Sequence, residues 1–132
     1  MSKITIELEL GARPSEREIE VVNILVTNKI PKRQVVFLRP NRTKGAKTPD
    51  ITIDGLPWEI KSIEKLGKYT LDHAERAGLR QADNLIFDLR QLKISLQEKT
   101  IREIQKEYLK RKTWKGLVVT IRPDDKCLTF SK

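Results

Sequence analysis

The amino-acid sequence predicts an α/β domain in which a mixed β-sheet is flanked by helices. Segments of alternating apolar residues, typical of strands, are interleaved with segments whose apolar residues recur at helical spacing. Asp54-Gly55 separates two short alternating segments, which is a strong signal for a tight hairpin. A length of 132 residues suits one hydrophobic core. The expected element order is β-α-β-β-β-α-β-α-β-β, with residues 1–132 forming a single domain.

The first half of the chain is expected to contain four strands and one helix. The helix begins at Pro14 or Ser15, because Glu18 follows Ser15 at the spacing of a capping box. It ends before Pro31, which cannot continue a helix. Strands are expected at residues 3–10, 34–39, 50–53 and 56–62, with a basic loop at residues 40–49.

The second half is expected to contain two helices and three strands. Apolar residues at helical spacing indicate the helices, and short apolar runs bounded by turn residues indicate the strands. The helices are expected at about residues 70–83 and from residue 95 or 97 to about residue 111, and the strands at residues 84–89, 116–121 and 126–130.

The composition excludes several classes of protein. No apolar run approaches the roughly 18 residues that a membrane-spanning helix needs. A single cysteine, Cys127, excludes a disulfide framework and a cysteine-based zinc finger, and His73 alone provides little for a catalytic triad. The net charge of +9 favours a polyanionic partner, of which nucleic acid is the commonest. A basic protein without such a partner is the alternative.

The predicted hairpin brings two carboxylates and a lysine together. A two-residue turn places Asp50 opposite Glu59, and Lys61 then emerges on the same face. Opposed carboxylates are mildly destabilising in a sheet, unless a divalent cation such as Mg²⁺ lies between them. A solvated polar face, on which Lys61 neutralises one carboxylate, is the alternative. The opposite, core-forming face is expected to carry Ile51, Ile53, Leu56, Trp58 and Ile60.

Glu18 lies on the apolar stripe of the first helix. A carboxylate that faces a core is costly unless it meets a cation or a hydrogen-bond donor. Capping of the helix N-terminus is an alternative role, and the two roles are compatible. Glu16 and Glu20 fall on the polar side and are the fallback candidates. The apolar residues around Glu18 are Ile19, Val21, Val22, Leu25 and Val26.

Residues 48–62, TPDITIDGLPWEIKS, resemble the second and third motifs of the PD-(D/E)XK nuclease superfamily. Pro49-Asp50 corresponds to the first part of the motif, and Glu59-Ile60-Lys61 to the second. This resemblance implies a restriction-endonuclease-like core of order α-β-β-β-α-β over residues 14–89. The strand at residues 3–10 has no counterpart in that core.

Together with PSEREIEVVNIL and RQADNLIFDLR, this segment is also similar to the tRNA-cleaving C-terminal toxin domain of CdiA-type contact-dependent growth inhibition proteins. That resemblance implies a metal-dependent endoribonuclease, delivered from a larger precursor into the cytoplasm of a competing bacterial cell. It also implies a cognate immunity protein, and we expect a monomer apart from that complex. Mg²⁺ is the expected cofactor, with Mn²⁺ or Zn²⁺ as alternatives.

The family resemblance implies that the catalytic residues are Glu18, Asp50, Glu59 and Lys61, and that Gln81 supports them. The metal ligands would be Asp50, Glu59, the main-chain carbonyl of Ile60 and, directly or through water, Glu18. The expected nucleic-acid-binding residues are Arg42, Lys44, Lys47, Lys65, Lys68, His73, Arg80 and Gln81. A DNA endonuclease with the same site and a non-catalytic nucleic-acid-binding module remain the alternative functions.

Overall fold

The computed structural model describes residues 3–41, 43 and 45–132, and confirms the predicted order of strands and helices. Within these residues, no helix is long and apolar enough to cross a membrane. The strands are β1 (Thr5–Leu8), β2 (Gln34–Phe37), β3 (Ile51–Ile53), β4 (Leu56–Ser62), β5 (Asn84–Asp88), β6 (Gly116–Ile121) and β7 (Lys126–Phe130). The helices are α1 (Glu16–Thr27), α2 (Thr70–Leu79) and α3 (Ile94–Lys110).

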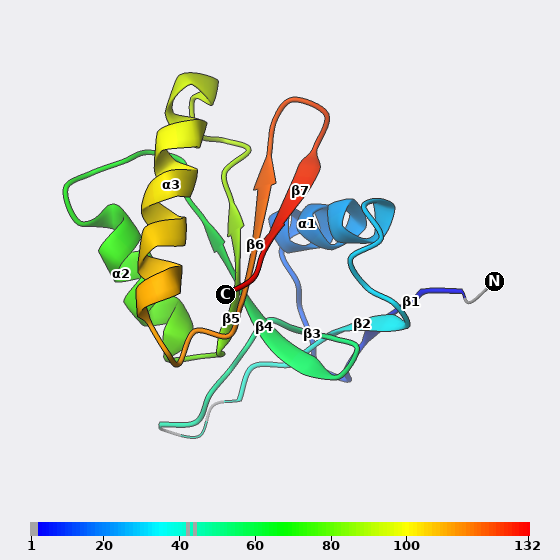
Figure 1. Ribbon diagram of the computed structural model, residues 1–132. Helices are drawn as coiled ribbons and strands as arrows, with labels where there is room; N and C mark the ends of the chain where they lie inside the picture. The colour runs from blue at the N-terminus through cyan, green and yellow to red at the C-terminus, as the bar shows by residue number, and fades with distance from the viewer. Residues whose placement is uncertain (1–2, 42, 44) are drawn as a thin grey trace.

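The strands described form one mixed seven-stranded sheet in sequence order. β2, β3 and β4 form an antiparallel meander, β4, β5 and β6 are parallel, and the outer strands are parallel β1 and antiparallel β7. Helix α1 covers one face of the sheet, whereas α2 and α3 lie together on the other (Figure 1). Neighbouring residues of β5 therefore enter different cores, with Ile86 on the α1 side and Phe87 on the α2–α3 side.

The predicted register of the β3–β4 hairpin is confirmed, since Ile53 pairs with Leu56 and Ile51 with Trp58. Both turn residues have positive φ angles, 49° at Asp54 and 88° at Gly55, as a tight hairpin turn requires. The Asp54 carboxylate also accepts hydrogen bonds from three successive backbone N–H groups at residues 32–34, at 2.7–3.0 Å. The aspartate thus ties the hairpin to the start of β2.

Two apolar residues expected in the core are exposed. Ile19 is 41% exposed and Leu56 is 59% exposed. Leu56 lies directly after the turn, at the tip of the hairpin. The buried stripe of α1 is narrower than the sequence predicts, and Ile19 falls outside it. That stripe consists of Val21, Val22, Ile24 and Leu25.

Helix α2 ends at Leu79, four residues before the predicted end at residue 83. The N–H groups of Gln81 and Ala82 both donate to the Gly78 carbonyl, so the chain turns there before β5. A Cβ atom at Gly78 would lie 2.8 Å from Leu85 Cδ2, which explains why glycine is needed where α2 packs on β5. This close packing places the last turn of α2 beside the hairpin.

A buried charge cluster joins the end of β5 to helix α1. Asp88 and Arg90 are 1% and 7% exposed. Arg90 Nε and Nη2 donate to the two Asp88 carboxylate oxygens at 2.9 and 3.1 Å, and Thr120 Oγ1 donates to Asp88 Oδ1 at 2.8 Å. Arg90 Nη2 also donates to Glu20 of α1 at 3.2 Å. The cluster therefore attaches α1, the helix that carries Glu18, to the end of β5.

Candidate active site

Asp50 and Glu59 meet at the open end of the β3–β4 hairpin, as the register predicts. Asp50 lies just before β3, and its main-chain carbonyl accepts a hydrogen bond from Leu38 N at 3.0 Å. Its side chain turns toward β4, where Oδ2 accepts a hydrogen bond from Ile60 N at 2.8 Å. Glu59 of β4 lies close enough to Asp50 for each carboxyl group to shift the pKa of the other. Two different strands thus position the two carboxylates.

Burial and the charge of a neighbouring carboxylate, Glu18 for Asp50 and Asp50 for Glu59, make both groups hard to ionise. Burial raises the pKa of Asp50 to about 6, against the lowering effect of the Ile60 N–H group. Burial and, after it, the Asp50 charge raise the pKa of Glu59 to about 8. Glu59 is 7% exposed, so a solvated polar face does not describe it. Lys61 Nζ lies 3.7 Å from Glu59 Oε2 and offsets part of this charge.

One oxygen of Glu59 is left without a partner. Glu59 Oε1 is buried and accepts no hydrogen bond from any described residue. Such an atom is costly unless it binds a proton or a cation. The Ile60 carbonyl lies on the same edge of β4 as Asp50, because the N–H and C=O groups of one strand residue point to the same side. Three oxygen-bearing groups suited to a hard cation therefore converge here.

Glu18 caps its own helix beside this pair. Its Oε1 accepts a hydrogen bond from Ser15 N at 2.8 Å and its N–H donates to Ser15 Oγ at 3.1 Å, which confirms the capping box. Its charge also contributes to the raised pKa of Asp50. Among the described residues, however, no three acidic, histidine or cysteine side chains are grouped so that they could hold a metal ion. Glu18 therefore adjoins the carboxylate pair without completing a three-ligand group.

Two cavities share the carboxylate pair as a common wall. Both are lined by Glu18, Asp50, Glu59 and Lys61. The first has a volume of about 340 Å³ and is here called the enclosed cavity because it is the less open of the two. The second, here called the open cavity, has a volume of about 880 Å³. The enclosed cavity is completed mainly by Arg13, Pro14, Phe37, Pro49, Ala77, Arg80 and Gln81, and the open cavity by Ser15, Glu16, Arg17, Glu20, Ser62 and Gln91.

The enclosed cavity contains two predicted residues and one that sequence reasoning missed. Arg80 and Gln81 line it from the end of α2. Gln81 Oε1 accepts hydrogen bonds from Thr48 N at 2.6 Å and Thr48 Oγ1 at 2.9 Å, so it supports the segment that leads to Asp50. Arg13 lines the cavity from the opposite side, before α1. Only its position directly before the predicted helix start could have indicated it.

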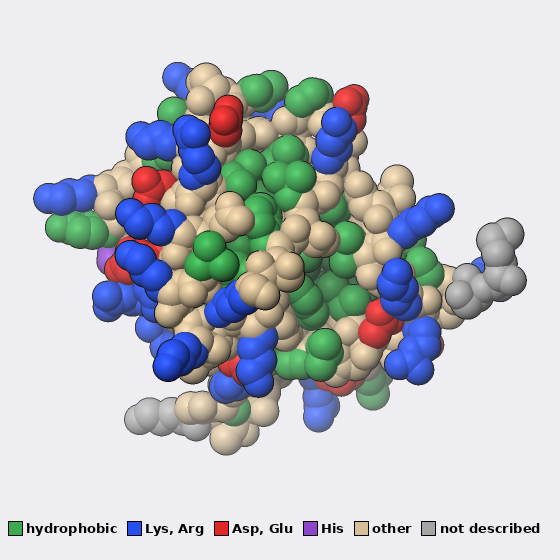
Figure 2. All heavy atoms as spheres, in the orientation of Figure 1, with side chains coloured by type: hydrophobic (Ala, Val, Ile, Leu, Met, Phe, Trp, Pro, Cys, Tyr) green, Lys and Arg blue, Asp and Glu red, His purple; other side chains and the backbone are tan. Residues whose placement is uncertain are grey.

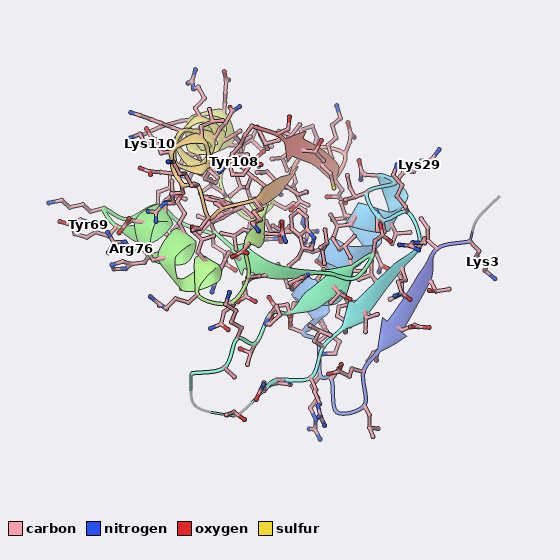
Figure 3. The ribbon with its side chains drawn as sticks, turned by 60° about the horizontal axis from the view of Figure 1, so that its bottom comes forward. Lys3, Lys29, Tyr69, Arg76, Tyr108 and Lys110 are labelled. Atoms are coloured by element: carbon pink, nitrogen blue, oxygen red, sulfur yellow. The ribbon has the colours of Figure 1, made fainter. Side chains whose placement is uncertain are left out.

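Other predicted nucleic-acid-binding residues lie elsewhere. Lys68 lies 5.4 Å from the Tyr69 ring centroid and lines a separate cavity between α2 and α3. His73 is exposed and stacks on Tyr69, which points outward from α2 as Arg76 does (Figure 3). Lys47 and Lys65 are exposed and line neither site cavity, whereas Arg42 and Lys44 lie outside the described residues. Lys and Arg side chains are also spread around the rim of the face in Figure 2.

The metal-free domain should lose stability as Glu59 ionises. A carboxyl whose pKa is raised on folding binds its proton more tightly in the folded state, so the stability it contributes falls as pH rises from about 4.5 to about 8. Melting temperatures in a chelator between pH 4 and 9 should show this fall when wild type is compared with Glu59→Gln. Glu75 is another buried carboxyl with a pKa raised to about 7. It is present in both proteins, so its contribution to the pH dependence of stability is the same in both curves. Parallel curves would show that Glu59 is not perturbed.

Comparisons with known proteins give one match. The family model described as the contact-dependent growth inhibition CdiA C-terminal domain matches residues 47–125, more than half of the chain. The matched segment contains Asp50, Glu59, Lys61 and Gln81, and it ends before β7. Helix α1, with Glu18, lies outside it. No curated protein and no solved structure matches the chain significantly.

Proposed function

This chain belongs to the CdiA C-terminal domain family of contact-dependent growth inhibition, and from that premise we propose that it is a metal-dependent endonuclease acting on tRNA. Domains of this family are toxins, delivered from a larger CdiA protein into target cells and paired with an immunity protein. The observation that carries the nuclease proposal is the buried Asp50–Glu59 pair beside Lys61. We assign these residues to phosphodiester hydrolysis.

The element order supports a PD-(D/E)XK core for this enzyme. From α1 to β5 the chain runs α-β-β-β-α-β, with an antiparallel meander followed by a parallel strand. The motif residues stand directly before β3 and in the middle of β4. Strand β1 adds to the edge of the sheet beside β2, outside this core.

The residues present fit a divalent cation with a preference for oxygen ligands. Asp50, Glu59 and the Ile60 carbonyl would hold it, and the orphaned Glu59 Oε1 would gain a partner. Mg²⁺ is commonly held by one or two carboxylates, with water and phosphate oxygens as the other ligands. The absence of cysteine and histidine from the lining favours Mg²⁺ or Mn²⁺ over Zn²⁺. Such an ion, when bound, polarises the phosphate and lowers the pKa of bound water.

The chain's own side chains would orient the reaction. Lys61 stands beside Glu59, where its ammonium group can donate to the attacking water and offset the charge that develops on the phosphate oxygens. The Ile60 N–H group fixes the orientation of Asp50. Arg13 and Arg80, on opposite sides of the enclosed cavity, would bind neighbouring phosphates without reading sequence. Lys47 and Lys65 would add to the attraction of a polyanion from farther away.

A direct comparison of substrates tests the proposed function. Purified protein is incubated with total tRNA and, separately, with plasmid DNA, in Mg²⁺ and in excess chelator. We expect Mg²⁺-dependent cleavage of tRNA and intact plasmid, and no cleavage by the matched double variant Asp50→Asn/Glu59→Gln. Cleavage of the plasmid instead would identify a DNA endonuclease. Binding without cleavage of either would identify a non-catalytic module.

Glu18→Gln should weaken Mg²⁺ binding about tenfold, the usual effect of removing a group that orients a metal ligand. The substitution keeps the capping box, because glutamine serves at the same position, so the helix should be retained. The measurement is the Mg²⁺-dependent rise in melting temperature, which follows from binding to the folded state. Glu16→Gln is the matched control and should not change it. A larger effect at Glu16 would transfer the role to that residue.

A further inference from the structure

The two cavities on either side of the carboxylate pair differ in character. Beyond the shared wall, the enclosed cavity is lined by apolar residues, including Pro14, Phe37 and Ala77, together with polar side chains such as Arg13 and Gln81. The open cavity is larger and is bordered by Glu16 and Glu20, two exposed acids of α1. If the cleaved phosphate lies at the shared wall, the nucleotide before it and the nucleotide after it would therefore have different surroundings.

The chemistry of the enclosed cavity suits a nucleobase. Small-molecule sites are typically cavities of about 300–1,000 Å³ with apolar walls and a few placed polar groups. At about 340 Å³ the enclosed cavity is at the lower end of that range. Gln81 uses its Oε1 for both Thr48 hydrogen bonds, while its Nε2 makes no hydrogen bond within the described residues. Its two N–H groups are thus free to donate to the oxygen or nitrogen of a base.

Resting on the proposed function, we infer that the enclosed cavity receives one unstacked nucleotide that flanks the cleaved bond. A base held in a duplex is stacked and paired, and it cannot enter an enclosed cavity without being flipped out. Arg13 and Arg80 then hold the phosphates at the mouth, and the carboxylate pair faces the cleaved bond. The substrate class is therefore nucleic acid that is single-stranded at the cleaved bond, and the enzyme contacts the base on one side of the cut more closely than the base on the other.

The experiment places an abasic nucleotide on each side of the cut in turn. A tRNA that the wild type cleaves is reassembled from synthetic fragments, each carrying one abasic position next to the cleaved bond. Loss of the base–protein contact should lower kcat/KM by roughly tenfold or more on one side only. Annealing a complementary strand over the cut should also block cleavage. Equal cleavage of both abasic substrates at the normal rate, together with cleavage of the duplex, would overturn the inference.

A cavity-filling variant gives a second, independent measurement. Ala77→Leu adds bulk to the wall of the enclosed cavity, so we expect a loss of at least tenfold on normal tRNA and no further loss on the sensitive abasic substrate. The control Ala46→Leu makes the same change in the basic loop, away from both cavities, and should cleave normally. A retained Mg²⁺-dependent thermal shift shows that the carboxylate pair of Ala77→Leu is intact. If Ala77→Leu still loses as much activity as the wild type when the base is removed, the base binds outside the enclosed cavity.

The outcomes separate this inference from the function on which it rests. Wild-type protein that cleaves no nucleic acid in any divalent metal would overturn both. Only the inference would be overturned if cleavage requires Asp50 and Glu59 but its rate does not depend on the flanking bases or on whether the substrate is single-stranded.

Discussion

Glu59→Gln is expected to abolish cleavage while leaving the domain folded. The buried carboxylate provides the oxygen that has no partner among the residues described by the structure, so its loss removes a metal ligand and several kcal/mol of transition-state stabilisation. We expect kcat/KM to fall by about a thousandfold or more, and Asp50→Asn to act similarly. The melting temperature without metal should stay level or rise, because one member of a repelling pair becomes neutral. Cleavage assays and thermal melting of the same preparations provide both measurements.

The control for this pair is Glu98→Gln. Glu98 is an exposed acid of α3 that pairs only with Arg102 among the described residues, so neither activity nor stability should change by a measurable amount. Lys61→Ala should also be inactive and folded, since Lys61 is half-buried at the edge of the site. Active, well-folded variants at Asp50, Glu59 and Lys61 would contradict the assignment of the site.

Arg90→Ala is expected to destabilise the domain by about 3–5 kcal/mol, the usual result of removing one member of a buried ion pair. Asp88 is 1% exposed in the wild type, and the substitution leaves its carboxylate with only Thr120 Oγ1 and the main-chain N–H of residue 90 as donors. The melting temperature should fall by roughly 10 °C or more. Because Arg90 also reaches Glu20 on α1, the affinity for Mg²⁺ should weaken as α1 loses this attachment.

A double variant separates the charge effect from lost packing. Asp88→Asn/Arg90→Met keeps similar volumes but removes both charges, and it should recover much of the stability lost in Arg90→Ala. Arg102→Ala, which breaks an exposed arginine–glutamate pair, should change the free energy of unfolding by less than about 1 kcal/mol. A melting temperature for Arg90→Ala close to that of wild type would show that the cluster contributes little to folding.

Local sequence patterns were sufficient for the elements and for the hairpin register. Asp54-Gly55 has the turn chemistry that two-residue hairpins require, and the period-two pattern on both sides permits one register. Ser15 and Glu18 mark the start of α1 because a capping box depends on residues three apart. The end of α2 was predicted less well, because the turn at residues 80–83 depends on how Gly78 packs against Leu85.

The prediction of the candidate site was less complete. Asp50, Glu59 and Lys61 could be placed together because they share one hairpin. Arg13 could not, because its approach to the site depends on how α1 crosses the sheet. The Asp88–Arg90 cluster could not be predicted from the sequence for a related reason, since it includes Glu20 and Thr120 from distant elements.

By itself, the amino-acid sequence determined the order of the elements, the turn at Asp54-Gly55 and the polar face of the hairpin. These features depend on residues close together in the chain, where spacing and turn chemistry restrict the backbone. Only the tertiary structure decided that Glu59 is buried, that Glu18 acts on Asp50 and that an enclosed and an open cavity share the carboxylate pair. Burial and pKa depend on which distant elements exclude water from a side chain, and local patterns do not specify that packing.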